Sequence, residues 1–231
     1  MANKTITQLD AAQSLNDNMV IAVQDTNTTY KTTLADVKAY CGGAPAGDKY
    51  KVGDRVKDDS NNDVGTVSSI FTDGNGDRYA VVCLDAVNRS SSGLWNNATS
   101  VSSIPYYNGY SAWSAPETST ANTTAILSTG TSSACTHCRS KSFTIDGVSY
   151  NGQLPNLNEL SQIFAQRTVI NNQDPTASSY SSLVIPTSGI QSWSSTQCSS
   201  SNAWNIGEYG AGDNNKAQGF FVIPILEIPL D

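Results

Sequence analysis

The sequence predicts an α+β fold in which short strands outnumber a few short helices. Three observations lead to this class. Segments of strand length recur along the chain, some alternating as in residues 63–71 and some apolar as in residues 220–228. The segment that follows the Leu-Pro step at 154–155 has helical spacing. Long polar stretches without a period or an internal repeat separate these elements, which argues against a helical bundle or a solenoid.

Composition indicates a globular chain with few charges. The 231 residues suffice for one full domain and a small additional unit. Only 14% of the residues are charged and the formal net charge is −7, with the basic residues scattered, so we expect no nucleic-acid partner. No apolar run approaches the roughly 18 residues that span a bilayer. The start at Met1 lacks the hydrophobic run of a secretory signal, so we expect cytoplasmic synthesis without membrane insertion.

Residues 1–41 are predicted to form a small module of their own. Strands are expected at 19–23 and 28–32, and Thr33 is a suitable cap for a short helix that follows them. Forty residues build only a small core. We therefore expect this module to attach to another protein or to associate with copies of itself.

Glycine, alanine and proline in residues 42–47 mark a linker, and residues 48–231 are predicted to form the second domain. Helical character is expected at 120–127 and again after Asn156, which has Glu159 at capping-box spacing. The segments predicted as strands are rich in β-branched and aromatic residues. These segments are 50–56, 63–71, 79–84, 182–185, 191–193, 203–205 and 220–228.

The order of motifs in the second domain resembles a known family. A Leu-Pro step at 154–155 opens a helix, a Trp-Ser-Ser-Thr strand follows at 193–196, an Ala-Trp strand at 203–204, and an apolar strand closes the chain at 220–228. This order is similar to that of the C-type-lectin-like domain at the C-terminus of bacterial collagen-like adhesins. It is also similar to the variable tail-tip proteins of phages. The resemblance implies short twisted antiparallel strands, two short helices and long loops over residues 48–231.

Residues 1–41 resemble a short N-terminal module of phage fibre and appendage proteins. The resemblance rests on a Leu-x-x-Ala-x-x-Leu pattern at 9–15 and a Lys-Thr-Thr-Leu segment at 31–34. Together the two resemblances imply a bacteriophage virion appendage, or fibre, protein. Such a protein would join other virion proteins through its first module and bind a host surface glycan or protein through its lectin-like domain. It would be located in the virion as a homo-oligomer, for which a trimer is our guess.

Three alternatives stay open. One is a structural head-decoration or fibre-assembly protein without direct receptor contact, and another is a bacterial surface adhesin. The third is an enzyme, because a related fold occurs in enzymes that oxidise cysteine to formylglycine. That activity needs a reactive cysteine pair, and we expect no enzymatic function here.

The polar segment that follows the Trp-Ser-Ser-Thr strand at 193–196 is the predicted contact surface. Loops on a rigid scaffold often carry recognition, although a solvated hairpin without a ligand has the same composition. The predicted ligand-binding residues of this segment are Gln197, Ser199, Ser200, Asn202, Asn205, Glu208, Tyr209 and Asn214. Tyr107 and Trp113 are added as exposed aromatic contacts from residues 86–118, which are predicted to be irregular. Trp193 and Trp204 are expected in the core.

Two short motifs bear on metal binding, and neither is complete. Residues 73–77 have the oxygen spacing of a calcium loop but are followed by Arg78 instead of glycine, and they equally predict a hairpin turn. The Cys-Thr-His-Cys segment at 135–138 lacks a second pair of ligands, so buried thiols or a disulfide are the simpler interpretations. We therefore expect no metal, no cofactor and no catalytic residue. Because the sugar-binding triplet of true C-type lectins is absent, any sugar binding would be calcium-independent.

Overall fold

The computed structural model describes residues 20–24, 29–33, 49–73, 76–96, 100–109, 112, 118–185, 189–207 and 210–230. The chain divides into two compact units, Met1–Lys49 and Tyr50–Asp231. In the first unit, β1 (Val20–Gln24) and β2 (Thr29–Thr33) form an antiparallel pair. The helix predicted after Thr33 and the linker predicted at 42–47 lie outside the described residues.

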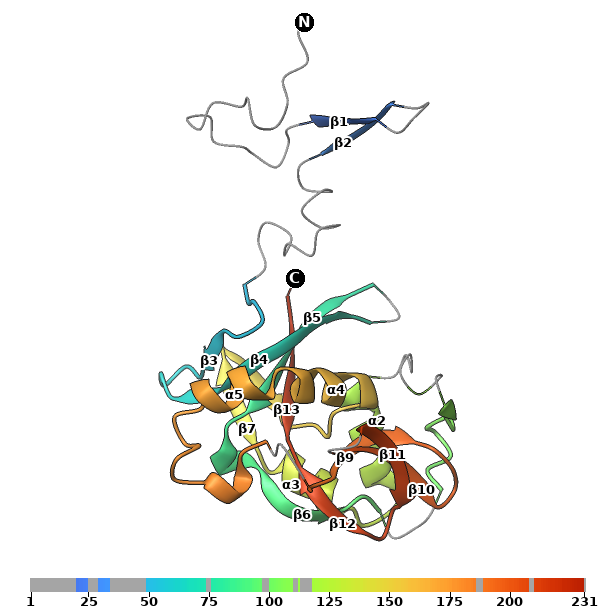
Figure 1. The fold of residues 1–231 in the computed structure, drawn as a ribbon. Helices are drawn as coiled ribbons and strands as arrows, with labels where there is room; N and C mark the ends of the chain where they lie inside the picture. The colour runs from blue at the N-terminus through green and yellow to red at the C-terminus, as the bar shows by residue number, and fades with distance from the viewer. Residues whose placement is uncertain are drawn as a thin grey trace, which may run out of the picture. The chain divides into compact units, whose positions relative to one another are not determined.

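The described part of the second unit is a mixed α+β structure with two main sheets and four α-helices. The first sheet is antiparallel and has the strand order β13-β5-β4-β3. Figure 1 shows it at the opposite end of the unit from the second sheet. Its strands are β3 (Arg55–Lys57), β4 (Asp63–Thr72), β5 (Arg78–Leu84) and β13 (Ile225–Pro229).

Strand β5 supplies side chains to two separate cores. Val81 and Cys83 belong to the cluster around α4, whereas Val82 and Leu84 belong to the cluster on the other side of the sheet. This division follows from the period of two along a strand, which sends successive side chains to opposite faces. The sheet is therefore buried on both sides along β5, whose sequence from Ala80 to Leu84 is apolar throughout.

The second sheet has the order β11-β10-β9-β12-β6, with β12 parallel to β9 and the other pairs antiparallel. Ring packing fixes its centre, because Trp193 is fully buried and its ring centroid lies 4.4 Å from that of Phe220. The strands are β6 (Ser90–Leu94), β9 (Ser192–Gln197), β10 (Asn202–Gly207), β11 (Gly210–Asn215) and β12 (Gly219–Val222).

Four helices and one hairpin complete the unit. Helix α4 begins with the predicted capping box, since the Asn156 side chain accepts from the Glu159 N–H and the Glu159 carboxylate accepts from the Asn156 N–H. No helix in the described residues is both long and apolar enough to cross a bilayer. The elements are α2 (Ser119–Thr129), α3 (Ser133–Arg139), α4 (Leu157–Ala165), α5 (Arg167–Gln173), β7 (Ser142–Ile145) and β8 (Val148–Asn151).

Several predicted elements are wrong in extent or type. The strand predicted at 50–56 shortens to β3, and the strand predicted at 182–185 is instead a 3-10 turn at Ser181–Leu183. The single closing strand predicted at 220–228 is two strands in different sheets. The chain changes sheet at Pro224, which has no N–H for a ladder but accepts from the Leu84 N–H.

Other elements were not predicted at all. Residues 86–118 contain β6, which has a serine-rich sequence, and the polar contact segment contains β11. Both strands have low β-propensity and are held by pairing with β12 and β10. Helices α3 and α5 and the β7–β8 hairpin were also missed, so the predicted two short helices are four in the structure. The predicted α+β class is confirmed.

Candidate functional site

A buried lysine holds the turn between β9 and β10 through hydrogen bonds to the turn backbone. The side chain of Lys216 is fully buried and its Nζ lies 4.7 Å from the centroid of the Trp95 ring. Nζ donates to the carbonyls of Ser199 and Ser200, at 2.9 and 3.0 Å. It also donates to Oε1 of Gln197. Burial lowers the pKa of Lys216 to about 8. The turn backbone is therefore held by a cation in an aromatic and polar cage.

Gln197 is part of this internal framework. Its Nε2 donates to the carbonyls of Val101 and Ile104, at 3.2 and 2.9 Å, and its Oε1 accepts from the Val101 N–H at 3.0 Å. The side chain is fully buried. The expectation that Gln197 faces a ligand is therefore wrong: its amide attaches the 101–104 segment to β9.

Asn205 is also buried, with 1% of its surface exposed. It lies on β10 opposite Gly212 of β11 and Trp193 of β9. Neither its Oδ1 nor its Nδ2 has a hydrogen-bond partner among the described residues. The prediction that Asn205 belongs to an exposed loop is thus wrong, since the residue lies within a sheet.

The β9–β10 turn and the neighbouring 100–109 loop present polar side chains that we call the tip surface. The Ser199 Oγ accepts from the Asn202 N–H at 3.0 Å, and the Asn202 Nδ2 donates to the Asp213 carboxylate at 2.7 Å. Cys198 Sγ lies 3.5 Å from Oδ1 of Asn108, which brings the 100–109 loop against the turn. The residues of the tip surface are Tyr106, Asn108, Ser199, Ser200, Asn202 and Asp213.

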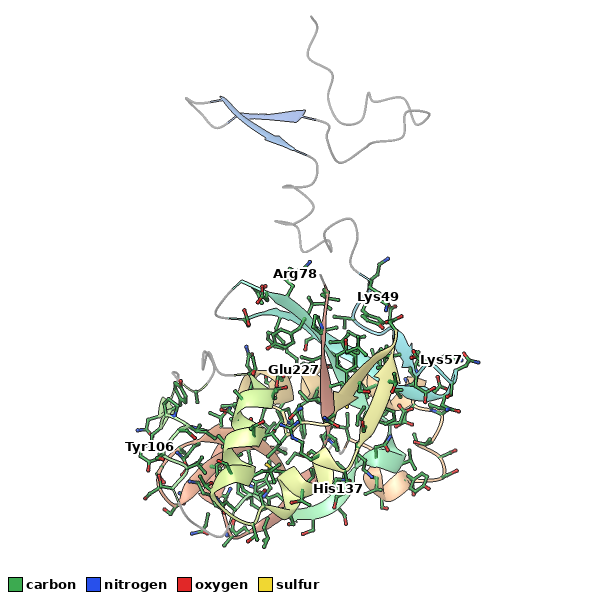
Figure 2. The ribbon with its side chains drawn as sticks, turned by 180° about the vertical axis from the view of Figure 1, so that it is seen from behind. Lys49, Lys57, Arg78, Tyr106, His137 and Glu227 are labelled. Atoms are coloured by element: carbon green, nitrogen blue, oxygen red, sulfur yellow. The ribbon has the colours of Figure 1, made fainter. Side chains whose placement is uncertain are left out.

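The aromatic residues of the 100–109 loop have different roles. Tyr106 is 49% exposed, and Figure 2 shows it at the periphery of the unit. Tyr107 is half-buried, its N–H donates to the Gln197 carbonyl at 3.0 Å, and its own carbonyl accepts from Nε1 of Trp204 at 2.7 Å. Tyr107 is thus mainly a packing residue, and Tyr106 is the exposed aromatic residue of this pair.

The remaining predicted site residues do not gather at one place. Asn214 follows Asp213 on β11 and so projects from the opposite face of the strand, where its Nδ2 lies 3.4 Å from Oε1 of Gln191. Glu208, Tyr209 and Trp113 lie outside the described residues. The tip surface therefore keeps three predicted contacts, Ser199, Ser200 and Asn202.

A pocket lies on the second sheet, and we call it the glycine pocket. Its volume is about 410 Å³. Five of its lining residues are glycine. Of the predicted contact residues that the structure describes, Asn214 contacts the lining residue Gln191 and Asn205 pairs with the lining residue Gly212. The lining residues are Ser91, Gly189, Ile190, Gln191, Gly207, Gly210, Ala211, Gly212, Gly219, Phe220 and Phe221.

Two neighbouring carboxyl groups, one buried and one partly exposed, link α2, α4 and β13. Glu159 is fully buried, and its Oε1 accepts from the Tyr79 hydroxyl at 3.2 Å while its Oε2 accepts from the Ser119 hydroxyl. Glu227, which Figure 2 shows on β13, accepts from the N–H groups of Ser119 and Thr120 at 2.8 and 3.1 Å. Burial and the neighbouring Glu227 raise the pKa of Glu159 well above its ordinary value. The pair caps two helix N-termini, which is a structural use of the carboxyl groups.

The cysteine motif lies in the core. Cys135 and Cys138 are buried free thiols on α3, as predicted, and burial raises the pKa of Cys135 to about 12. His137 Nε2 lies 2.8 Å from the Asn88 carbonyl. A thiol with a raised pKa holds its proton at neutral pH and is a poor nucleophile and ligand. Among the described residues, no cluster of histidine, cysteine and carboxylate side chains has the size a metal ion needs.

The predicted calcium segment is described only at its two ends. The Asp73 N–H donates to the Asp77 carbonyl at 2.9 Å, and the Asp77 N–H donates to Oδ1 of Asp73 at 3.0 Å. These bonds close a turn between β4 and β5, which agrees with the hairpin interpretation. Residues 74–75 lie outside the described part.

Comparison with known proteins adds no relative: no family model, no curated protein and no solved structure matches this chain. The C-type-lectin-like resemblance therefore stays a prediction that rests on the motif order.

Proposed function

We propose that this chain is a bacteriophage virion appendage protein whose second unit binds the host cell surface through the tip surface. One observation carries the proposal: exposed polar side chains stand on a backbone that is fixed from within. Ser200 is exposed, while its carbonyl is held by the buried Lys216. A rigid backbone lowers the entropic cost of ordering a contact loop when a partner binds.

The chemistry of the tip surface suits recognition of a polar partner. Hydroxyl and amide groups of Ser199, Ser200 and Asn202 supply donors and acceptors, and Tyr106 adds a large amphipathic ring. Such contacts are individually weak. Several copies on one particle multiply them, because the second and later contacts form at a high effective concentration.

The proposed test is adsorption competition with purified full-length protein. Antibodies against residues 50–231 are expected to label an appendage on particles from the source culture, and excess protein is expected to slow adsorption of those particles to host cells. Ser200→Arg places a bulky charge on the tip surface and should remove the competition. Ser149→Arg, on the exposed part of β8, is the matched control and should compete like the wild type.

The outcomes separate the proposal from its alternatives. Labelled particles without competition would indicate a structural virion protein, and the receptor-binding proposal would then be abandoned. Labelling of bacterial cells with no labelled particle would favour the surface adhesin. Competition that survives Ser200→Arg would reject the tip surface as the contact.

A further inference from the structure

The glycine pocket has a size and a lining that suit a small polar ring. Its volume of about 410 Å³ falls in the range of pockets that enclose small molecules, roughly 300 to 1,000 Å³. Gly210 and Gly212 leave open space over the sheet, because a Cβ built on Gly210 would meet nothing within 4 Å and one built on Gly212 would lie 3.9 Å from Oδ1 of Asn205. A site of this volume accepts one or two ring-sized units.

The lining chemistry defines the class of ligand. Among the described residues that line the pocket, none is ionisable. Phe220 is partly exposed and is backed by the Trp193 ring at 4.4 Å, so one rigid aromatic wall faces the pocket. Gln191 and Ser91 add an amide and a hydroxyl, which both donate and accept. An aromatic wall with neutral donors and acceptors favours an uncharged ligand with an apolar face and several hydroxyl groups.

The buried amide of Asn205 is a second, independent observation. Asn205 pairs with Gly212 across β10 and β11, and a Cβ built on Gly212 would lie 3.9 Å from Oδ1 of Asn205. Gly212 and Gly207, the next residue on the same face of β10, both line the pocket. The amide therefore lies beside the glycine floor with neither polar atom hydrogen-bonded within the described residues. Such a group costs free energy in a folded protein unless it meets a polar partner.

From these observations we propose that the glycine pocket binds one uncharged hexopyranose unit of a glycan, without a metal ion. The C–H face of the sugar ring packs on Phe220, its hydroxyls bond Gln191 and Ser91, and one hydroxyl or its bridging water meets the Asn205 amide past Gly212. The pocket is separate from the tip surface. Its biological meaning rests on the proposed host-surface function, but the binding is measured without any particle.

The test is saturation-transfer NMR and titration of the full chain with a panel of methyl glycosides. The panel contains the neutral methyl glycosides of glucose, galactose, mannose and N-acetylglucosamine, with methyl glucuronide as the charged comparison. We expect at least one neutral glycoside to bind in the presence of EDTA, and the glucuronide to bind at least roughly tenfold more weakly. If no neutral glycoside of the panel binds, the proposal is overturned.

Gly212→Val is the decisive variant. Its backbone lies outside the left-handed region and nothing crowds the new Cβ, so the methyl groups enter the pocket without displacing the strand. Affinity should fall at least roughly tenfold. Thr144→Val, which adds the same side chain to the exposed β7 strand, should bind like the wild type. Equal binding by Gly212→Val and Thr144→Val would overturn the site.

Asn205→Leu separates a ligand group from a framework group. The substitution keeps the shape and removes the buried amide, so we expect weaker sugar binding with an unchanged or higher melting temperature. A lower melting temperature with unchanged binding would assign the amide to the framework and contradict the proposal.

The adsorption assay distinguishes failure of the sugar-binding proposal from failure of the proposed host-surface function. If the wild-type protein binds sugar but does not compete for adsorption, the pocket proposal stands and the host-surface function is overturned. If the Gly212→Val variant still competes for adsorption, the host-surface function stands and the glycine pocket is excluded as the surface that contacts the host.

Discussion

At the scale of single residues, Lys216 is the residue on which the tip surface most depends. Its burial, its side-chain hydrogen bonds to Gln197, Ser199 and Ser200, and its contact with Trp95 hold the β9–β10 turn. Lys216→Met keeps most of the side-chain volume but leaves the acceptors of Gln197, Ser199 and Ser200 without their shared donor. We expect the free energy of unfolding to fall by about 3 kcal/mol, because a buried charge-assisted network is broken.

Urea unfolding followed by tryptophan fluorescence measures this loss. Lys57→Met is the control, since Lys57 is exposed and its Nζ donates to the side chain of the nearby Asn61. It should change the free energy of unfolding by no more than about 0.5 kcal/mol. Equal effects of the two variants would show that the buried lysine does not stabilise the turn.

Glu159 sets a second residue-scale expectation, which concerns pH. Because burial raises its pKa in the folded state, the folded protein holds the proton more tightly than the unfolded chain does. The resulting stabilisation is complete below the ordinary pKa of 4.5 and is lost as the pH rises through the raised pKa. Glu159→Gln keeps a neutral side chain at every pH, so its stability should exceed that of the wild type increasingly above that value.

Unfolding free energies at about pH 5 and about pH 8 test this expectation, with a wild-type slope of up to about 1.4 kcal/mol per pH unit. Glu159→Ala is the comparison. It removes the acceptor for the hydroxyls of Tyr79 and Ser119 and should be less stable than the wild type at both pH values. If Glu159→Gln keeps the wild-type slope, Glu159 is not the group that titrates.

At the scale of elements, the sequence predicts those helices and strands whose stability comes from residues close together in the chain. The α4 start was predictable because Asn156 and Glu159 satisfy each other's backbone within four residues. β6 and β11 were not, because their stability comes from partners elsewhere in the chain, β12 and β10. The same limit applies to the site: the sequence indicated a polar surface near 199–202, whereas Gln197 and Asn205 are buried by pairings that no local pattern records.

The cap of α4 gives the prediction at this scale. Asn156→Ala removes the acceptor for the Glu159 N–H, at 2.9 Å, and should cost about 1 kcal/mol of unfolding free energy. Asn158→Ala, two residues on in the first turn, is the matched control and should be close to neutral. Thermal unfolding of both variants by circular dichroism decides. A neutral result for Asn156→Ala would mean that other contacts, such as the Thr196 hydroxyl that accepts from the Leu157 N–H, hold the helix start.

At the scale of the whole molecule, the two units differ in what they need in order to fold. The unit Tyr50–Asp231 has three buried clusters of its own. The described part of the unit Met1–Lys49 is one two-stranded hairpin, and such a hairpin is marginal in water unless something packs on it. We therefore predict that residues 50–231 alone fold as a monomer, whereas the full chain is a homo-oligomer assembled through its first unit.

Size-exclusion chromatography with light scattering, at the same protein concentration for both chains, measures the two masses. The unfolding midpoint of residues 50–231 should match that of the same unit in the full chain, because this unit has three buried clusters built from its own described residues. Oligomerisation also determines the expected avidity, since weak tip contacts give firm attachment only when several copies act together. A monomeric full chain would remove that mechanism, and an oligomer formed by residues 50–231 alone would move the assembly surface to the second unit.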